Sequence, residues 1–172
     1  MAYDAASPSR SAAPVRADFP KQTDFKEVLA HLAGGVAIIS CWDGETPRGL
    51  LVSSITGLSV EPPRFLFCVR KEAGCHDALV KASDCGVALL ARDDEEEAWR
   101  YASSARSPER FSPERWSLAP SAPPAYYGGV ARAHCVTDHV VDAGTHSILV
   151  VTAKESILTP AQPLVAWNRG FL

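Results

Sequence analysis

The chain has 172 residues, 47% of them hydrophobic and 22% charged, and its formal net charge is −3. This length fits one domain that buries a core of its own, and the ordinary apolar fraction excludes a chain that is disordered throughout. The chain has 17 Lys and Arg against 20 Asp and Glu, so it lacks the excess of positive charge that would predict nucleic-acid binding. No apolar run has the ~18–20 residues needed to span a membrane.

The cysteines and the first residues predict where the protein is found. There are five cysteines without C-x-x-C spacing, which predicts reduced thiols and a cytoplasmic protein, and the chain starts without the apolar core of a secretory signal. Residues 1–22 are rich in Ala, Ser, Pro and Arg and have no hydrophobic period. We therefore expect a flexible tail, followed by one domain over residues 23–172. The alternative is an arm that packs across a partner subunit.

The first ordered element is predicted to be a short amphipathic helix beginning near Asp24. Asp24 and Glu27 resemble a capping box, with Asp in place of Ser or Thr. Gly34-Gly35 ends the helix, because glycine adopts the left-handed cap conformation without strain. The apolar residues at helical spacing between these signals are Phe25, Val28, Leu29 and Leu32.

The rest of the chain is rich in short strands. Asp43-Gly44 predicts a hairpin turn, with a loop that extends to Pro47 as the alternative, and Pro62-Pro63 must interrupt strand pairing because proline lacks the N–H of a ladder. Helices are predicted at 78–82 and 93–102, and the proline-rich stretch 103–124 is predicted to be a long surface loop. The predicted strands are 36–40, 49–54, 65–69, 86–90, 130–137, 139–141, 147–153 and 164–167.

This order of elements predicts a mainly β (α+β) fold. Short strands separated by tight turns favour a barrel over a parallel sheet, with a leading helix and short helices inserted between strands. The alternative is a doubly wound α/β fold, although no G-x-G-x-x-G follows any strand.

Polar residues at the predicted strand ends are candidates for ligand binding. The hydroxyls of Ser53, Ser54 and Thr56 could bind a phosphate or the edge of a heterocycle, although serines also cluster in ordinary turns. Arg70-Lys71 could neutralise a phosphate, or could be a solvated pair. His146 enters a strand from a turn, where it could donate to a ligand carbonyl or simply lie on the surface.

Metal binding and nucleophilic catalysis are less favoured. Cys75-His76 and His134-Cys135 are adjacent pairs, and neighbouring strand residues point to opposite faces, so neither pair is placed to chelate one ion. No G-x-S-x-G motif is present. We therefore expect no metal site.

From Phe25 to Phe171, the order and spacing of these segments resemble the short-chain flavin reductases of two-component monooxygenase systems, which have an FMN-binding split barrel. Residues 49–63, G-L-L-V-S-S-I-T-G-L-S-V-E-P-P, stand where the family typically reads G-M-T-V-S-S-F-T-S-V-S-L-D-P-P. Further matches in the same order are Gly34-Gly35-Val36, Cys68-Val69-Arg70, Gly144-Thr145-His146 (family G-D-H) and the closing residues 164–171, which resemble a strand followed by R-G-Y.

The resemblance implies a six-stranded split barrel, a homodimer, and FMN or FAD held in a groove near the subunit interface. It implies hydride transfer from NADH or NADPH to flavin N5, after which reduced flavin leaves for a separate oxygenase. It leaves open which flavin and which nicotinamide cofactor are used.

The resemblance also implies roles for the candidate residues. It places Ser53, Ser54 and Thr56 against the isoalloxazine edge or the ribityl chain. His146 would be the catalytic residue near flavin and nicotinamide. The remaining implied positions are Arg70, Lys71 and His76 on the phosphate side and Arg169 at the same pocket.

Several residues depart from the family pattern by removing a polar group: Leu51, Gly57, Gly74, Cys75, Ala88 and Thr145. A lost hydrogen bond costs about 0.5–1.5 kcal/mol, so several together could weaken flavin binding by orders of magnitude. One hypothesis is a reductase that uses flavin as a loosely held substrate. The alternative is a repurposed barrel that serves as a binding or partner module or in another biosynthetic step.

Overall fold

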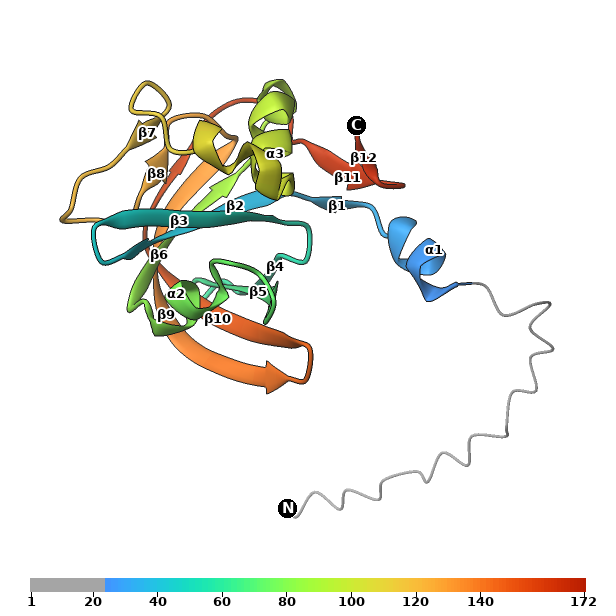
Figure 1. Cartoon of the computed structure of the whole chain (residues 1–172), viewed down its shortest axis with the longest axis horizontal. Helices are drawn as coiled ribbons and strands as arrows, with labels where there is room; N and C mark the ends of the chain where they lie inside the picture. The colour runs from blue at the N-terminus through green and yellow to red at the C-terminus, as the bar shows by residue number, and fades with distance from the viewer. Residues whose placement is uncertain (1–23) are drawn as a thin grey trace, which may run out of the picture.

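A seven-stranded antiparallel sheet forms the body of the protein in the computed structural model, which describes residues 24–172 (Figure 1). The predicted tail over residues 1–22 lies outside this range. In spatial order the strands are β3 (Thr46–Val52), β2 (Ala37–Asp43), β6 (Asp84–Leu89), β9 (Ala131–Ala143), β10 (His146–Leu158), β5 (Arg64–Arg70) and β4 (Thr56–Ser59).

The sheet curves because its two edge strands follow each other in the chain. Only residues 53–55 separate the end of β3 from the start of β4, so the first and last strands of the sheet must come together. A sheet whose edges meet in this way is a barrel. The predicted mainly β barrel is thus confirmed, with seven strands in the main sheet instead of six.

A tight turn joins the first two strands of the sheet, and a bulge interrupts the pairing of another strand without ending it. Asp43 pairs with Thr46, so the first hairpin has a two-residue turn in which Gly44 takes a φ of +60°. The stretches predicted as separate strands, 130–137 and 139–141, are one strand, β9. The break in hydrophobic pattern near Asp138 is a bulge, where β10 shifts register between Val150 and Val151.

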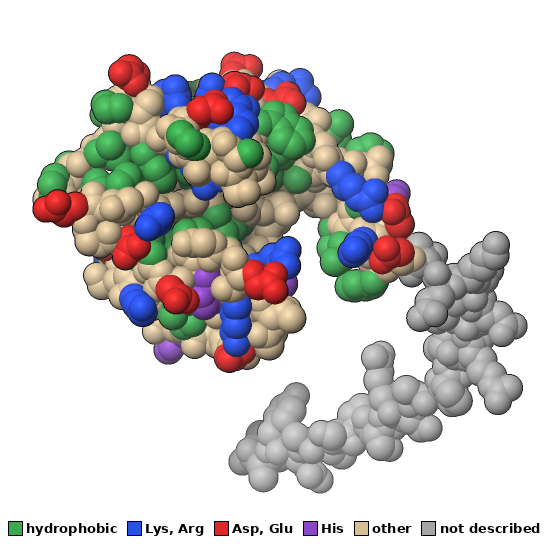
Figure 2. Space-filling model, viewed as in Figure 1, with side chains coloured by type: hydrophobic (Ala, Val, Ile, Leu, Met, Phe, Trp, Pro, Cys, Tyr) green, Lys and Arg blue, Asp and Glu red, His purple; other side chains and the backbone are tan. Residues whose placement is uncertain are grey.

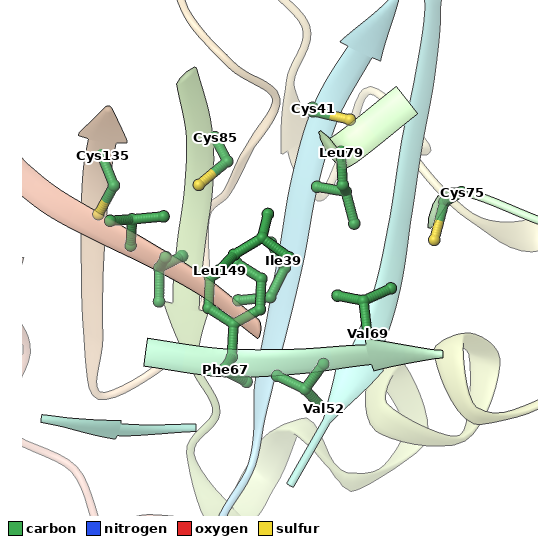
Figure 3. Close-up of a cluster of buried hydrophobic side chains, with 13 residues drawn as sticks. Ile39, Cys41, Val52, Phe67, Val69, Cys75, Leu79, Cys85, Cys135 and Leu149 are labelled. Atoms are coloured by element: carbon green, nitrogen blue, oxygen red, sulfur yellow. The ribbon is translucent and has the colours of Figure 1, made fainter. Parts of the chain in front are cut away.

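The barrel interior is filled by apolar side chains from alternating strand positions. Phe67 and Val69 of β5, Ile39 of β2 and Leu149 of β10 are essentially inaccessible to water (Figure 3). Helix α2 (His76–Lys81) covers one end of the barrel with Leu79. Four of the five cysteines belong to this core, and burial raises their thiol pKa, to about 12 for Cys41 and Cys135.

A second core lies between the barrel and helix α3 (Glu95–Ala102). The predicted surface loop 103–124 is anchored here, because Trp116 is buried and donates its indole N–H to the buried carboxylate of Glu97 at 3.0 Å. Glu97 also accepts from Arg100 at 2.7 Å. The short elements around this core are η1 (Arg92–Asp94), η2 (Ser104–Glu109), β7 (Trp116–Ser117) and β8 (Ala125–Tyr126).

Helix α1 (Phe25–Ala30) stands away from the barrel together with a small C-terminal sheet (Figure 1). That sheet consists of β1 (Gly34–Gly35), β11 (Val165–Trp167) and β12 (Gly170–Phe171). As predicted, Asp24 caps the helix and accepts from the backbone N–H of Lys26 at 3.0 Å. No residue of α1 is buried, and Figure 2 shows its apolar side chains facing open space. Among residues 24–172, no helix is long and apolar enough to cross a membrane.

Candidate functional site

The turn between β3 and β4 separates two candidate binding surfaces, which we call half-sites. One half-site lies on strands β5 and β10, the other is a cavity near α1, and neighbouring serines of the turn point to different half-sites. The Ser54 hydroxyl is hydrogen-bonded to the backbone N–H and carbonyl of Cys68 on β5, both at 3.2 Å. Ser53 instead lines a cavity next to Arg169. Both serines are exposed. We call residues 53–56 the corner.

On the β5–β10 side of the corner, predicted residues share one outward face. Phe67 and Val69 point into the core, so Leu66, Cys68 and Arg70 must point outward. Residues directly opposite in antiparallel strands lie on the same face. Thr56 pairs with Leu66, and His146 pairs with Arg70. The structure therefore places Thr56, Arg70 and His146 on one surface, with Ser54 at its edge.

His146 has one ring nitrogen occupied. Its Nδ1 lies 2.9 Å from the Thr145 hydroxyl, and the ring makes no other hydrogen bond to the described part of the chain. The side chain is half-buried. When the neutral ring accepts from Thr145 at Nδ1, its proton is on Nε2, which is free to donate to a ligand.

Each of the two cations at the end of β5, Arg70 in its last position and Lys71 directly after it, has a carboxylate partner. Arg70 donates to Glu72 at 2.8 Å, and both side chains are largely exposed. Lys71 reaches both carboxylate oxygens of Asp142, at 2.8 and 2.7 Å. The hydrogen bond from Lys71, followed by that from the Gly144 amide, lowers the pKa of Asp142.

His76 does not lie on the surface with the other predicted residues. It is 9% exposed, and its Nε2 is 2.9 Å from the Ser147 hydroxyl. Its Nδ1 is 2.9 Å from Asp77, whose pKa is lowered mainly by this hydrogen bond and then by Lys81. Both ring nitrogens are thus occupied, Nε2 by the buried Ser147 hydroxyl and Nδ1 by the exposed Asp77 carboxylate.

On the other side of the corner is a cavity of about 530 Å³ between α1, α3, the end of β3 and the C-terminal sheet. Its polar lining includes Ser53, Arg169, Lys26 and Asn168, and Arg169 is paired with Glu27 of α1. Leu51 lines the cavity and packs partly against the second core. The corner is therefore not filled by the leucine that replaces the family's threonine.

Sequence reasoning missed the aromatic residues of this cavity, namely Trp99, Tyr101, Trp167 and Phe171. They come from two separate parts of the chain, so no local pattern distinguished them from core residues. A smaller cavity of about 300 Å³ lies under the loop before β8 and contains none of the predicted site residues. Over residues 24–172, no three metal-ligating side chains converge.

These features define a small-molecule-binding β-barrel, and comparison with known proteins identifies its family. Residues 29–172 match the family described as flavin reductase like domain. The chain belongs to this family, as the motifs around the corner predicted.

Two curated relatives illustrate the likeness. The chain is 30% identical over 152 residues to an NADH-dependent FAD reductase of Streptomyces globisporus, covering 87% of this chain and 83% of the relative. It is 32% identical over 122 residues to HsaB of Rhodococcus jostii, the reductase subunit of a flavin-dependent monooxygenase. That match covers 71% of this chain and 62% of HsaB.

A solved structure supports the fold. BorF, the flavin reductase component of a bacterial two-component tryptophan halogenase, superposes with a TM-score of 0.78. The two chains are 27% identical, and the match covers 86% of this chain and 94% of BorF. The predicted flavin reductase split barrel is confirmed.

Proposed function

We propose that this protein is an NADH- or NADPH-dependent flavin reductase that supplies reduced FMN or FAD to a partner monooxygenase. The observation that carries the proposal is the open corner, flanked on one face by Arg70 and by a His146 ring whose Nε2 is free. Family membership and the relatives that reduce FAD or FMN with NADH support the same activity.

The residues at the corner fit a flavin. Its ring edge presents alternating hydrogen-bond donors and acceptors, which the exposed hydroxyl of Ser53 on the cavity side or of Thr56 on the β5–β10 side would complement. The cavity of about 530 Å³ offers aromatic walls of a kind that pack against flat rings. Arg70 is exposed and can exchange Glu72 for a phosphate, which it binds with a planar fork of donors. Flavin, when bound, accepts a hydride from the nicotinamide.

The task of the protein's own residues is to hold two flat rings in contact and exclude water. Such positioning can supply roughly 7–11 kcal/mol of a barrier in the best-oriented cases. The N–H at Nε2 of His146 would donate to an oxygen on which negative charge develops. Thr145 would support that role by fixing the ring tautomer through Nδ1.

We further propose that the protein is a homodimer whose second copy covers α1. Phe25 and Leu32 are 67% and 69% exposed, and a six-residue helix is too short to be stable without packing. The relatives HsaB and BorF are components of two-component systems, which supports an oxygenase as the recipient of reduced flavin. A cytoplasmic location remains a prediction from the cysteines.

The proposal is tested by anaerobic titration of FMN and FAD with NADH and NADPH in the presence of the purified protein. We expect loss of flavin absorbance at catalytic protein concentrations with at least one pair. A protein that turns over no flavin with either nicotinamide cofactor would eliminate the reductase assignment.

The second candidate, a barrel that binds without catalysis, is favoured by two observations. The cations Arg70 and Lys71 at the end of β5 are already paired with carboxylates, and several hydrogen-bonding groups of the family pattern are replaced, for example at Leu51, Gly57 and Ala88. It predicts high-micromolar or weaker flavin binding and no turnover. A protein that retains yellow flavin through gel filtration would contradict it.

A further inference from the structure

The connection between β5 and α2 is fastened to the turn between β9 and β10, which carries His146. The Lys71 ammonium bridges both carboxylate oxygens of Asp142, and Asp142 also accepts from the backbone N–H of Gly144 at 2.8 Å. The backbone N–H of Lys71 donates to the Thr145 carbonyl at 3.0 Å. One residue thus holds this turn through its side chain and through its backbone.

A second link lies on the other side of His146. The buried ring of His76 is hydrogen-bonded to the hydroxyl of Ser147, which is itself only 4% exposed. Asp77 holds the opposite nitrogen of that ring. The links from Lys71 and His76 therefore reach residues on both sides of His146 in the chain.

Among the described residues, the exposed turn is held by these links and by the strand pairing of His146 with Ala143 and Arg70. Residues 142–145 are all exposed, and Gly144 takes a φ of +74° that other residues adopt only with strain. Exposed hairpin ends with few buried contacts open locally at low cost. Without the links, the ring of His146 would sample several positions relative to the corner.

The same contacts make both residues poor phosphate ligands. A phosphate would have to displace Asp142 from Lys71, and at the nearly buried His76 ring it would have to displace Asp77 or Ser147. Arg70 differs from both, because it lies on the outward face and holds only Glu72, which is itself exposed.

We propose that Lys71 and His76 are positioning residues that hold the His146 turn in place, and that Arg70 is the cation for the flavin phosphate. This inference rests on the proposed reductase function. It changes the roles that the family resemblance implies for Lys71 and His76, and it keeps the role implied for Arg70.

The phosphate group provides the first test, because FMN and riboflavin differ only there. We expect Lys71→Met and Asp142→Asn each to lower kcat about three- to tenfold with both flavins, leaving the ratio of their KM values unchanged. Arg70→Met should raise KM for FMN and leave KM for riboflavin unchanged. Arg48→Met, which breaks the exposed ion pair with Asp43 in the β2–β3 hairpin, is the matched control and should change neither constant.

Rescue by a similar side chain provides the second test. The amide N–H of glutamine can occupy the place of the imidazole Nε2, so His76→Gln should keep the link to Ser147 and retain most of kcat. His76→Ala should lose that link and lower kcat about tenfold. Thermal unfolding of both variants identifies any loss of activity that comes from misfolding. Equal losses of kcat in two folded variants would overturn the role of His76.

A readout without turnover separates this proposal from the proposed function. In a two-dimensional NMR spectrum of the side-chain imidazoles, Lys71→Met should shift or broaden the His146 signal, and Arg48→Met should not. The proposal is overturned if the His146 signal stays unchanged in Lys71→Met, or if that variant raises KM for FMN alone. A wild-type protein without reductase activity would refute the proposed function, while the NMR result would still decide whether Lys71 positions His146.

Discussion

The two sides of the corner are built in different ways. On the β5–β10 side, His146 stands in a paired strand, and Lys71 and His76 link its surroundings to the rest of the barrel. On the α1 side, the main links are the Arg169–Glu27 pair and the backbone hydrogen bond from Asn168 to Ala30. Contacts within the chain therefore hold the residues of the first side in place. The second side has fewer such contacts, and apolar side chains of α1 beside it are exposed in the single chain.

The difference has a functional consequence. Preorganised groups cost no ordering at the moment of reaction, so we place catalysis on the β5–β10 side. The α1 side carries the larger cavity and exposed apolar residues, so we expect affinity for flavin to depend there on a second copy of the chain. Mutations on the two sides should therefore separate into effects on kcat and effects on KM or assembly.

The largest expected effect is that of His146→Ala on turnover. The variant loses the Nε2 donor but no core packing, because the half-buried His146 belongs to neither hydrophobic core. We expect kcat to fall about 100-fold while the melting temperature changes by only a few degrees. Stopped-flow reduction and thermal unfolding of the same preparation measure both. A parallel loss of stability and activity would identify a structural histidine.

A double substitution at Phe25 of α1 and at Leu32, two residues after the helix ends, should have the next largest effect, on assembly. Burial of one such apolar side chain contributes about 1.5–3 kcal/mol, so Phe25→Asp with Leu32→Asp should weaken dimerisation about 100-fold or more. Sedimentation velocity at several protein concentrations measures this change. Val60→Asp, at a 92% exposed apolar residue outside α1, is the control. Unchanged dimers in the α1 variant would contradict the assignment of this face to the second copy.

The two serines of the corner allow a smaller and sharper comparison. Ser54→Ala loses hydrogen bonds to the backbone of Cys68 and should lower stability by about 0.5–1.5 kcal/mol. Ser53→Ala loses no hydrogen bond to the described residues and should instead raise KM for flavin severalfold. Urea unfolding and steady-state kinetics on both variants test this difference. If Ser53→Ala lowered stability and Ser54→Ala raised KM instead, the roles assigned to the two serines would be wrong.

The smallest expected effect is the response of the His146 turn to acid. Because Lys71 and Gly144 lower the pKa of Asp142 below its ordinary 3.8, the folded state binds its proton more weakly than the unfolded state. This contribution to stability is complete above the ordinary pKa and is lost as the pH falls through the folded value. The difference in melting temperature between wild type and Lys71→Met should therefore shrink between about pH 5 and pH 3. If the difference in melting temperature grew as the pH fell over this range, the pKa of Asp142 would not be lowered by folding.

Local patterns predicted much of the fold. Asp24 predicted the start of α1, and Asp43-Gly44 the first hairpin, because capping and turn chemistry depend on adjacent residues. The corner motif predicted the barrel and the family. The break within β9 was misplaced, because a bulge interrupts the sequence pattern without ending the strand. The anchored Trp116 was missed, because its partner Glu97 lies 19 residues away.

The sequence by itself determined the architecture and the types of residue available to the site, since strand period, turns and motif order depend only on local chemistry. Only the tertiary structure decided on which surface each of those residues lies. Ser53 and Ser54 are neighbours in the chain but belong to different half-sites. His76 lies a few residues after Lys71, yet its ring points inward to Ser147. The direction of a side chain is set by the strands that pack around it, and those strands come from distant parts of the chain.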